Sequence, residues 1–417
     1  MSERVKVAID YCIKQKQEHL LDYLKPVFSD KAAYLAEQIL KSDFSVVNKL
    51  FKESSTNLSD MKSQIITPIK SFDLASATEK QKDEMTRLGM DAIIKGEVAS
   101  ITMAGGQGTR LGHSGPKGTF LLESVPAKSL FEIQTDRLLE IHTKTDVYIP
   151  WLIMTSEENN DETINYFKQN DYFSYDPMKI HFFKQEMIPV VDNEGKVLVN
   201  ERGLVLSPDG NGGVFSSLRN SGEYRWIKEQ GIKKVFICGI DNILVKVADP
   251  LFIGFSIQTG KEVASKSTYK RSYNENAGVF CYKNNKPSYI EYTEIPEDKA
   301  KAVDEYKQFL YGDIGIVMYV FDMDIIDRIS LYPLPYHVAR KKTPYILPSG
   351  ERMIPSSANS IKFETFIFDS FEMIDDIAIL RVTREEEFAP VKNLEGADSP
   401  ETALRMYNER YGQKLIN

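Results

Sequence analysis

Residues Met103–Gly118 read Met-Ala-Gly-Gly-Gln-Gly-Thr-Arg-Leu-Gly-His-Ser-Gly-Pro-Lys-Gly. The residues that lead into this stretch, Val98–Ala104, are uncharged and small, β-branched or apolar, which is typical of a strand buried on both faces of a parallel sheet. Glycines lack a Cβ, so their backbone can approach a ligand closely and turn free N–H groups towards it. The stretch therefore predicts a buried strand that leads into a phosphate-binding loop.

Two cations in this loop supply the charge that backbone amides lack. Arg110 carries a planar guanidinium that can hold phosphate oxygens in pairs, and Lys117 carries a compact charge on a flexible stem. The spacing fits neither the dinucleotide fingerprint nor the Walker A loop, because the lysine lies in Pro-Lys-Gly. For the glycines alone, a surface loop with two solvated cations is the alternative.

The composition excludes several classes of protein. The chain has 417 residues, of which 42% are hydrophobic and 27% charged, as expected for globular domains. A formal net charge of −8 argues against nucleic-acid and anionic-membrane surfaces, so the cations for an anionic ligand must be gathered locally. Three dispersed cysteines favour reduced, buried thiols over disulfides. Since no signal core or apolar span is evident, we expect a cytoplasmic protein without membrane or nucleic-acid partners.

The first part of the chain favours helices. Apolar residues recur at helical spacing from Ser2 to Ser54, and the polar stretch from Ser54 to Thr78 has the composition of a linker laid over the next domain. We therefore expect an N-terminal helical region with its linker at residues 1–78, a central domain at 79–395 and a short tail at 396–417.

Helices and strands then alternate along the chain. A capping box, Ser129-x-x-Glu132, predicts the start of a helix, and Asp241 ends an apolar strand. We predict strands at 147–154, 179–183 and 234–240, a hairpin at 190–199, and helices at 161–169 and 214–230. Repeated strand–helix–strand units predict a mainly parallel, Rossmann-like α/β sheet with ligands at the C-terminal ends of its strands.

A second glycine-rich stretch, Ser207–Gly213, reads Ser-Pro-Asp-Gly-Asn-Gly-Gly and favours a tight turn when taken alone. Together with the glycine loop and with Ile240–Pro250, it resembles the signature of the eukaryotic-type UDP-N-acetylhexosamine pyrophosphorylases, in the UDP-glucose pyrophosphorylase type 1 family. The similarity includes Gln17–Leu21, His337–Ala339 and Glu385–Lys392, and covers most of residues 1–400.

The resemblance implies roles for individual residues, each with a structural alternative. The uracil and ribose would be held by Met103, Ala104, Gly105, Gly106, Gln185, Pro208 and Gly210. The phosphates would be held by Arg110, Lys117 and Lys362. The sugar would be contacted by Asn211, Gly278, Glu291 and Asp313, with Gly278 leaving room for a bulky 2-substituent. Asp241 would lie near the metal.

The implied reaction joins UTP and N-acetylglucosamine 1-phosphate into UDP-N-acetylglucosamine and pyrophosphate. The resemblance implies a nucleotidyltransferase that uses Mg²⁺, for which Mn²⁺ can substitute, because a hard cation suits one or two carboxylates plus substrate oxygens. The five histidines are scattered along the chain, which argues against zinc. Asp241 is the expected metal ligand, and the second ligand is open, with Asp369 as one candidate.

Two departures from the family pattern bear on the substrate and the assembly. The chain has Leu310-Tyr-Gly-Asp-Ile314 where the family has Asn-Ala-Gly-Asn-Ile, so a carboxylate at Asp313 replaces an amide that contacts the sugar. UDP-glucose, UDP-galactose or broad UDP-sugar synthesis is therefore the alternative. Relatives continue beyond the position of Pro400, so we expect a reduced C-terminal region and a monomer or weak homo-oligomer.

Two rival functions belong to other classes. A nucleotide-sugar glycosyltransferase would use a metal-binding Asp-x-Asp, which Asp322-Met-Asp324 could supply, although these residues also suit the start of a helix at 323–329. A catalytically silent sugar-nucleotide sensor would keep the fold and lose its phosphate-binding cations. All three cations are present, which disfavours the sensor.

Overall fold

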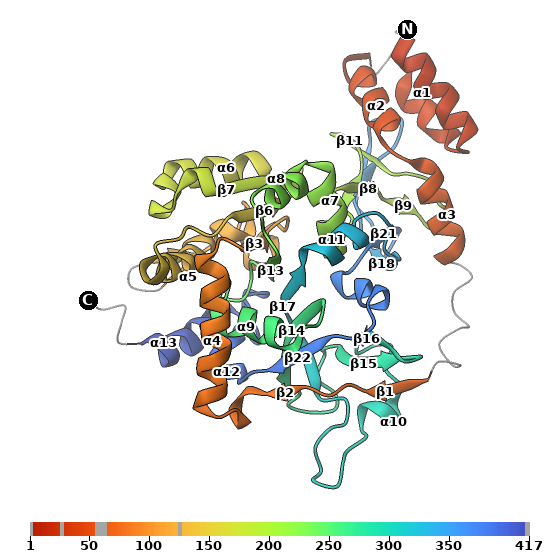
Figure 1. The fold of residues 1–417 in the computed structure, drawn as a ribbon. Coiled ribbons are helices and arrows are strands. Elements are labelled where there is room, and N and C mark those ends of the chain that lie inside the picture. The colour runs from red at the N-terminus through yellow and green to blue at the C-terminus, as the bar shows by residue number, and fades with distance from the viewer. Residues whose placement is uncertain (1–2, 26–28, 55–64, 124–126, 413–417) are drawn as a thin grey trace. The chain divides into compact units, whose positions relative to one another are not determined.

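The computed structural model describes residues 3–25, 29–54, 65–123 and 127–412, which form two compact units (Figure 1). The sheet unit comprises residues 65–185, 214–333 and 367–417, and the N-terminal unit comprises residues 1–64, 186–213 and 334–366. The expected boundaries at 78 and 395 do not coincide with these units, because two segments of the expected central domain belong with the N-terminal helices.

The sheet unit is built on an eleven-stranded sheet. Its main row runs in the order β2 (Phe72–Asp73), β22 (Ala378–Arg381), β14 (Val263–Tyr269), β17 (Asp313–Asp322), β13 (Lys234–Gly239), β3 (Val98–Met103), β6 (Trp151–Thr155) and β7 (Ile180–Lys184). Only β17 is antiparallel to its neighbours in this row, and the other pairs are parallel. This confirms the mainly parallel α/β sheet and the strands predicted at 179–183 and 234–240, whereas the strand predicted at 147–154 begins only at Trp151.

The expected linker at 54–78 is wrong where the structure describes it. Residues 55–64 lie outside the described residues, but those that follow form β1 (Ile66–Pro68), β2 and a 3-10 turn, Leu74–Ser76. Strand β1 pairs with β15 (Val279–Lys283), which also pairs with β16 (Lys286–Ile290). A polar sequence with little periodicity therefore contributes two strands to the sheet, because pairing with partners far along the chain decides the conformation of such short segments.

Helices connect and cover the strands of this unit. They are α4 (Glu79–Ile94), α5 (Leu130–Thr145), α6 (Asn160–Gln169), α7 (Val214–Asn220), α8 (Glu223–Glu229), α9 (Pro250–Thr259), α10 (Glu297–Ala300), α11 (Met323–Ile329), α12 (Arg384–Glu387) and α13 (Pro400–Tyr411). Ser129 caps α5 by accepting a hydrogen bond from the Glu132 N–H at 3.1 Å. The helix expected at 214–230 is two helices, because Gly222 lies between them with φ +91°.

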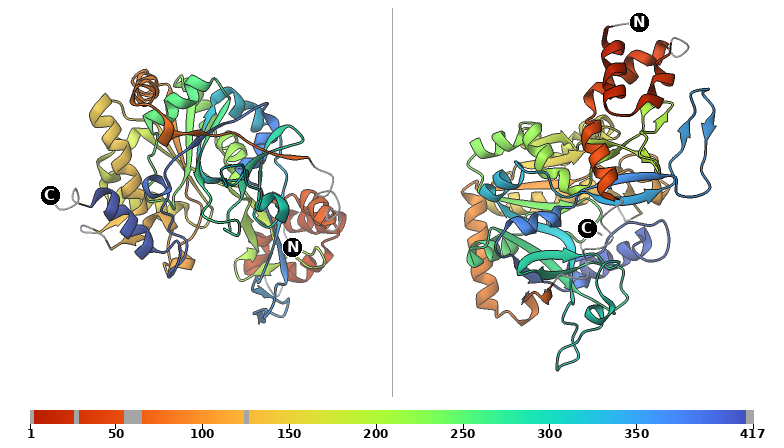
Figure 2. Two further views of the ribbon diagram at one scale, coloured as in Figure 1. Left: turned by 90° about the horizontal axis from the view of Figure 1, so that it is seen from below. Right: turned by 90° about the vertical axis from the view of Figure 1, so that its right-hand side faces the viewer.

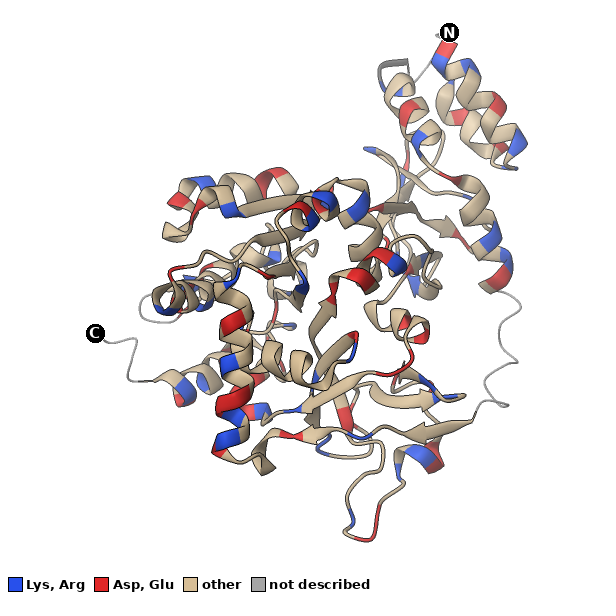
Figure 3. Cartoon of the chain, in the orientation of Figure 1, with Lys and Arg blue, Asp and Glu red and all other residues tan. Residues whose placement is uncertain are grey.

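Helices α4 and α9 pack closely in the same unit, as two views of the ribbon show (Figures 1 and 2). A Cβ on Gly89 would lie 1.8 Å from the carbonyl oxygen of Pro250, and a Cβ on Gly254 would lie 1.6 Å from that of Met85. Only glycine permits this backbone contact. Acidic and basic residues are interspersed along α4, whereas α9 carries no charged residue (Figure 3).

The N-terminal unit combines helices with short strands. Its helices are α1 (Glu3–Lys14), α2 (Ser29–Lys41), α3 (Phe44–Ser54) and a 3-10 helix, Glu18–Leu24. Its strands are β8 (Met187–Pro189), β9 (Val191–Asp192), β10 (Val199–Asn200), β11 (Gly203–Leu204), β12 (Leu206–Pro208), β18 (His337–Lys341), β19 (Tyr345–Ile346), β20 (Arg352–Met353) and β21 (Ser360–Glu364).

Gln17 joins the helices of this unit to the predicted hairpin at 190–199. Its side chain is buried, donates to the carbonyl of Gly195 at 3.0 Å and accepts from the N–H of Val197 at 2.9 Å. His19 bonds to the carbonyl of Val197 at 2.8 Å. The stretch Gln17–Leu21, which resembles the opening of the family, therefore holds the hairpin in place.

Among the described residues, every helix is too short or too polar to cross a bilayer.

The three buried cysteines should react slowly with thiol reagents in the native protein. Cys12, Cys238 and Cys281 are free and buried, and burial raises the pKa of each thiol to about 12. Because the thiolate is the reactive form, the native protein at pH 8 should react with Ellman's reagent far more slowly than a free thiol does. Denaturation in guanidinium should expose all three thiols. Rapid reaction of any thiol in the native protein would contradict this burial.

Candidate functional site

The glycine loop leaves the C-terminal end of β3 and closes on itself. The N–H of Gly108 donates to the carbonyl of Gly115 at 3.0 Å, and the N–H of Lys117 donates to the carbonyl of Gly106, also at 3.0 Å. His113 Nε2 lies 2.8 Å from Thr119 Oγ1, which ties the loop to the turn that follows it. The closed loop places Lys117 next to the glycines from which the loop begins.

A buried asparagine, Asn159, anchors the start of this loop. Its side-chain amide donates to the carbonyls of Ala104 at 2.9 Å and Gly106 at 3.3 Å. Its own carbonyl oxygen accepts from the N–H of Ser156 at 2.8 Å. No pattern in the sequence singles out this residue, since an asparagine just before α6 is an ordinary residue at a helix start.

Gly105 and Gln185, both expected at the uracil, lie side by side. A Cβ on Gly105 would lie 2.5 Å from Gln185 Oε1, so a larger residue at this position would displace the amide from the loop. The N–H of Gln185 donates to the carbonyl of Thr155 at 2.8 Å, at the end of β6. The structure therefore brings these two residues together at the same edge of the sheet as Met103 and Ala104.

Lys117 meets Asp241 at this edge. Strands β3 and β13 are parallel neighbours with Met103 opposite Gly239, so the residues that follow both strands emerge together. Lys117 Nζ lies 3.4 Å from Asp241 Oδ2, and the two side chains are 13% and 28% exposed. Lys117 of the glycine loop and Asp241 after β13, which belong to separate motifs in the sequence, thus form an ion pair.

Lys392 is a further cation of this group that the sequence did not single out. Burial lowers the pKa of the Lys117 ammonium, the Asp241 carboxylate offsets part of this effect, and the nearby charges of Arg110 and Lys392 lower it further. The charges of Arg110 and Lys392 therefore both act on Lys117, whose ammonium is paired with the Asp241 carboxylate. The match of Glu385–Lys392 to the family was the only signal available for Lys392.

Pro208, Gly210, Asn211 and Lys362 belong to the N-terminal unit. Gly210 has φ +94°, and its Cβ would lie 2.1 Å from the carbonyl oxygen of Thr365. The loop is thus packed on the chain that leaves β21, which carries Lys362. Neighbouring Ile361 and Phe363 point into the core, so Lys362 lies on the opposite face of the strand.

Gly278 and Glu291 flank the paired ends of β15 and β16, where Val279 lies opposite Ile290. A Cβ on Gly278 would lie 2.3 Å from the ring of Tyr289, so this ring accounts for the glycine without any ligand. Burial raises the pKa of Tyr289 well above its ordinary value, and the Glu291 carboxylate raises it further. The expected open space at Gly278 is therefore filled by an aromatic side chain.

Asp313 has a different environment from the one expected. Its buried carboxylate accepts from Arg381 Nε at 2.8 Å and Nη2 at 2.7 Å. It also accepts from the hydroxyls of Ser267 at 2.7 Å and Ser71 at 2.9 Å. Four donors occupy the hydrogen-bonding sites of its two oxygens. The expected contact of Asp313 with a sugar therefore needs correction, since the carboxylate is committed to Arg381 and two serines.

The Asp-x-Asp pair of the glycosyltransferase hypothesis lies away from the glycine loop. Asp322 is ion-paired with Lys234, the first residue of β13, whereas Asp241 follows the last residue of the same strand. The predicted helix at 323–329 is α11, and Asp322 is its N-cap residue. Asp322 therefore has a structural role, and among the described residues it is paired with Lys234 and not with Arg110 or Lys117.

The residues present fit a hard metal ion shared with substrate. No group of three His, Cys, Asp or Glu side chains in the described ranges could hold a metal by itself. Asp241 is partly exposed and lies beside the lysine of the phosphate loop. A single carboxylate next to a polyphosphate site is a typical arrangement for Mg²⁺, which keeps several waters and takes its other ligands from phosphate.

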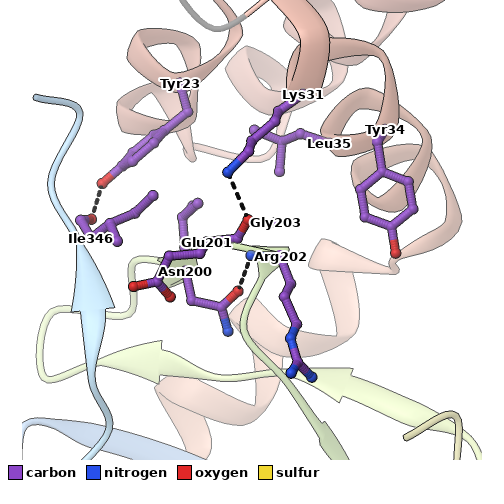
Figure 4. Close-up of a pocket in the computed structure, with 10 residues that line it drawn as sticks. Tyr23, Lys31, Tyr34, Leu35, Asn200, Glu201, Arg202, Gly203 and Ile346 are labelled. Carbon is purple, nitrogen blue, oxygen red and sulfur yellow. Dashed lines mark hydrogen bonds between the residues drawn. The ribbon is translucent and has the colours of Figure 1, made fainter. Parts of the chain in front are cut away.

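The N-terminal unit also contains a hollow of about 470 Å³ that includes none of the expected site residues (Figure 4). Lys31 donates across it to the carbonyl of Glu201 at 3.1 Å, and Tyr23 donates to the carbonyl of Ile346 at 2.8 Å. The side chains of Tyr34 and Leu35 complete one wall. These contacts connect the helices to β10, β11 and β19.

Comparison with known proteins agrees with this geometry. The sequence matches the UTP–glucose-1-phosphate uridylyltransferase family over residues 41–410. It is 37% identical over 409 residues to the UDP-N-acetylglucosamine pyrophosphorylase of Saccharomyces cerevisiae, covering 94% of this chain and 84% of the yeast protein. It is 36% identical over 345 residues to UDP-N-acetylglucosamine diphosphorylase 1 of Arabidopsis thaliana, covering 78% and 67% of the two chains.

The fold is also similar to solved structures. The crystal structure of the uridine diphosphate N-acetylglucosamine pyrophosphorylase from Trypanosoma brucei, in complex with an inhibitor, superimposes with a TM-score of 0.85 at 29% identity. The match covers 100% of this chain and 86% of that one. On this similarity of sequence and fold, the chain belongs to the UTP–glucose-1-phosphate uridylyltransferase family.

Proposed function

We propose that this chain transfers a uridylyl group from UTP to N-acetylglucosamine 1-phosphate, giving UDP-N-acetylglucosamine and pyrophosphate. The relatives named for this activity match most of the chain, which supports the reaction. The observation that carries the proposal is the ion pair of Lys117 with Asp241 at the exit of the closed glycine loop. It gathers phosphate-binding charge at the C-terminal edge of a parallel sheet, where such folds bind nucleotides.

The chemistry requires charge neutralisation and alignment. A phosphate oxygen of the sugar phosphate attacks the α-phosphorus of UTP, and the bond to the bridging oxygen of the departing pyrophosphate breaks. Both substrates are polyanions and repel each other unless cations intervene. Arg110, Lys117 and Lys392 can supply those charges, and the loop amides can bind oxygens on which charge develops. The attacking oxygen is already anionic, so alignment of the two substrates replaces nucleophile activation.

A divalent ion is the expected cofactor, and we propose Mg²⁺, with Mn²⁺ as a substitute. When bound, it would neutralise phosphate charge and draw electron density from the α-phosphorus. Asp241 would hold it from the protein side. The partial exposure of this carboxylate and its position beside Lys117 support the assignment.

The remaining site residues keep the roles that the resemblance implies, as proposals. Met103 to Gly106, Gln185, Pro208 and Gly210 would hold the uracil and ribose. Asn211 would contact the sugar, and Lys362 would bind phosphate. Glu291 would accept hydrogen bonds from sugar hydroxyls. We further propose a monomer or weak homo-oligomer in the cytoplasm, which the three reduced cysteines support.

Replacing Lys117 by alanine should lower kcat by about 10²-fold or more, because its charge serves the transition state. The melting temperature should change little, since the loop is also held by Asn159, by its own backbone bonds and by His113. Steady-state kinetics and a thermal melt of the same preparation measure both effects. Unchanged kinetics would remove Lys117 from the reaction, and a collapse in stability would make its role structural.

Activity should require a divalent cation and be abolished by excess EDTA. Asp241→Asn keeps the shape of the side chain and loses the charge that attracts a hard cation, so it should lower activity and raise the Mg²⁺ concentration needed for half-maximal rate. A titration of rate against Mg²⁺ measures this change. Asp369→Asn, assayed in parallel, tests the open second ligand. Full activity in EDTA would refute the metal requirement.

A panel of sugar 1-phosphates with UTP should give the highest kcat/KM for N-acetylglucosamine 1-phosphate. Hydrogen bonds to a substrate group can make such a preference steep. If glucose or galactose 1-phosphate were preferred, the reaction would stand and the N-acetyl assignment would fall.

Asp313→Asn is the matched control for this panel. An amide cannot reproduce the double charge-assisted bond with Arg381, so the variant should melt at a lower temperature while the ratio of kcat/KM between sugars stays unchanged. A shift of preference among the sugars would restore Asp313 to the sugar site.

A further inference from the structure

A short segment carries Lys392 to the end of β13. Residues 387–392, which we call the strap, begin at the last residue of α12 and run beside Asp241–Ile243. Asn242 Nδ2 donates to the carbonyl of Glu387 at 2.6 Å, and Asn242 Oδ1 accepts from the N–H of Ala389 at 2.9 Å. The N–H of Val391 donates to the carbonyl of Asp241 at 2.8 Å. The strap is thus bonded along its length to the residues that follow β13.

A buried group of charges lies under the first residue of the strap. Lys266, in the middle of β14, is 0% exposed and donates to Asp249 Oδ2 at 2.6 Å and to Glu387 Oε2 at 2.5 Å. Lys246 donates to the other oxygen, Glu387 Oε1, at 2.8 Å. Glu387 is 1% exposed, so both of its carboxylate oxygens are held by ammonium groups away from solvent.

Burying these charges costs more free energy on folding than burying apolar side chains of the same size would. Removing a lysine and two carboxylates from water carries a large desolvation penalty, which the attraction between the charges at best balances. Burial opposes the charge on Lys266, but Asp249 and Glu387 together raise its pKa, so the ammonium persists. The attraction is directional, since one carboxylate faces two ammonium groups. The group therefore defines the position of Glu387 more sharply than apolar packing would.

We propose that Lys266 and Glu387 are positioning residues of the uridylyl transfer: they fix the start of the strap so that Lys392 is held at the phosphate-binding cations. This inference rests on the proposed function. Asn242 holds Glu387 and Ala389, and the backbone of Asp241 holds Val391. Because these bonds join consecutive parts of a short segment, a displacement of Glu387 would also displace Lys392.

The test uses the full chain with Lys266→Met, which keeps the length and apolar stem of the side chain and removes its charge. We expect kcat/KM with UTP and N-acetylglucosamine 1-phosphate to fall about 10- to 100-fold, as expected for a small misplacement of a catalytic group. Lys234→Met is the matched control. Lys234 is also a mostly buried, ion-paired lysine of the same sheet, but it begins β13 at the end remote from Asp241. Its kcat/KM should stay within about 2-fold of wild type.

A double-mutant cycle with Lys392→Ala separates positioning from a general loss of structure. If Lys266 acts through Lys392, Lys266→Met should lower kcat/KM little further in a chain that already carries Lys392→Ala. The proposal would be overturned if the double variant lost kcat/KM by the product of the two single losses. Wild-type kinetics in a folded Lys266→Met protein would also overturn it. If Lys266→Met fails to fold, Glu387→Gln replaces it in the same cycle, because the amide keeps the shape and loses only the charge.

Binding of UTP with Mg²⁺, measured by calorimetry, distinguishes failure of this proposal from failure of the proposed function. A wild-type chain that binds UTP but releases no pyrophosphate with any sugar 1-phosphate would refute the reaction. In that case the strap is still tested, because Lys266→Met and Lys392→Ala should weaken UTP binding to a similar extent and not additively. Equal affinity in wild type and Lys266→Met would overturn the positioning role.

Discussion

The ion pair between Lys117 and Asp241 joins segments 124 residues apart and depends on almost every feature of the sheet unit. It forms because β3 and β13 are parallel neighbours, so that the loops after both strands leave the sheet at the same edge. It also requires the glycine loop to close, since the bond from Lys117 N–H to the carbonyl of Gly106 returns the lysine to the loop's origin. The sheet thus serves mainly to align strand ends that carry charge.

The concentration of like charge at this edge has a physical cost. Burial lowers the pKa of the Lys117 ammonium first, and the positive charges of Arg110 and Lys392 lower it further, against the opposing effect of Asp241. One carboxylate does not neutralise three cations. An arrangement of this kind is stable when anionic substrates complete it, which is how a site of excess positive charge within an acidic chain favours polyphosphate ligands. The charges under the strap are balanced instead, because two lysines face two carboxylates and each carboxylate is paired inside the protein.

Glycine has two distinct uses in this fold. At Gly105 and at Gly278 the missing side chain leaves room for a side chain from elsewhere in the sheet unit, the amide of Gln185 in the first case. At Gly278 the missing side chain is replaced by the ring of Tyr289, and at Gly89 and Gly254 it allows α4 and α9 to touch. These glycines look alike in the sequence. Only their neighbours in space distinguish a glycine that leaves room for a side chain from one that allows two helix backbones to touch.

The sequence by itself determined the alternation of strands and helices, the phosphate loop after β3 and the likeness to a family, because these depend on residues close together along the chain. Hydrophobic period, capping residues and glycine spacing are local signals. The tertiary structure alone decided that β1 and β2 join the sheet, that Asn159 holds the loop and that Lys392 joins the cations. It also turned Asp313 from an expected sugar contact into the partner of Arg381. The physical reason is the same in each case: the interaction is made with a residue distant in sequence, and the identity of such a partner is set by strand order and packing, which no local pattern records.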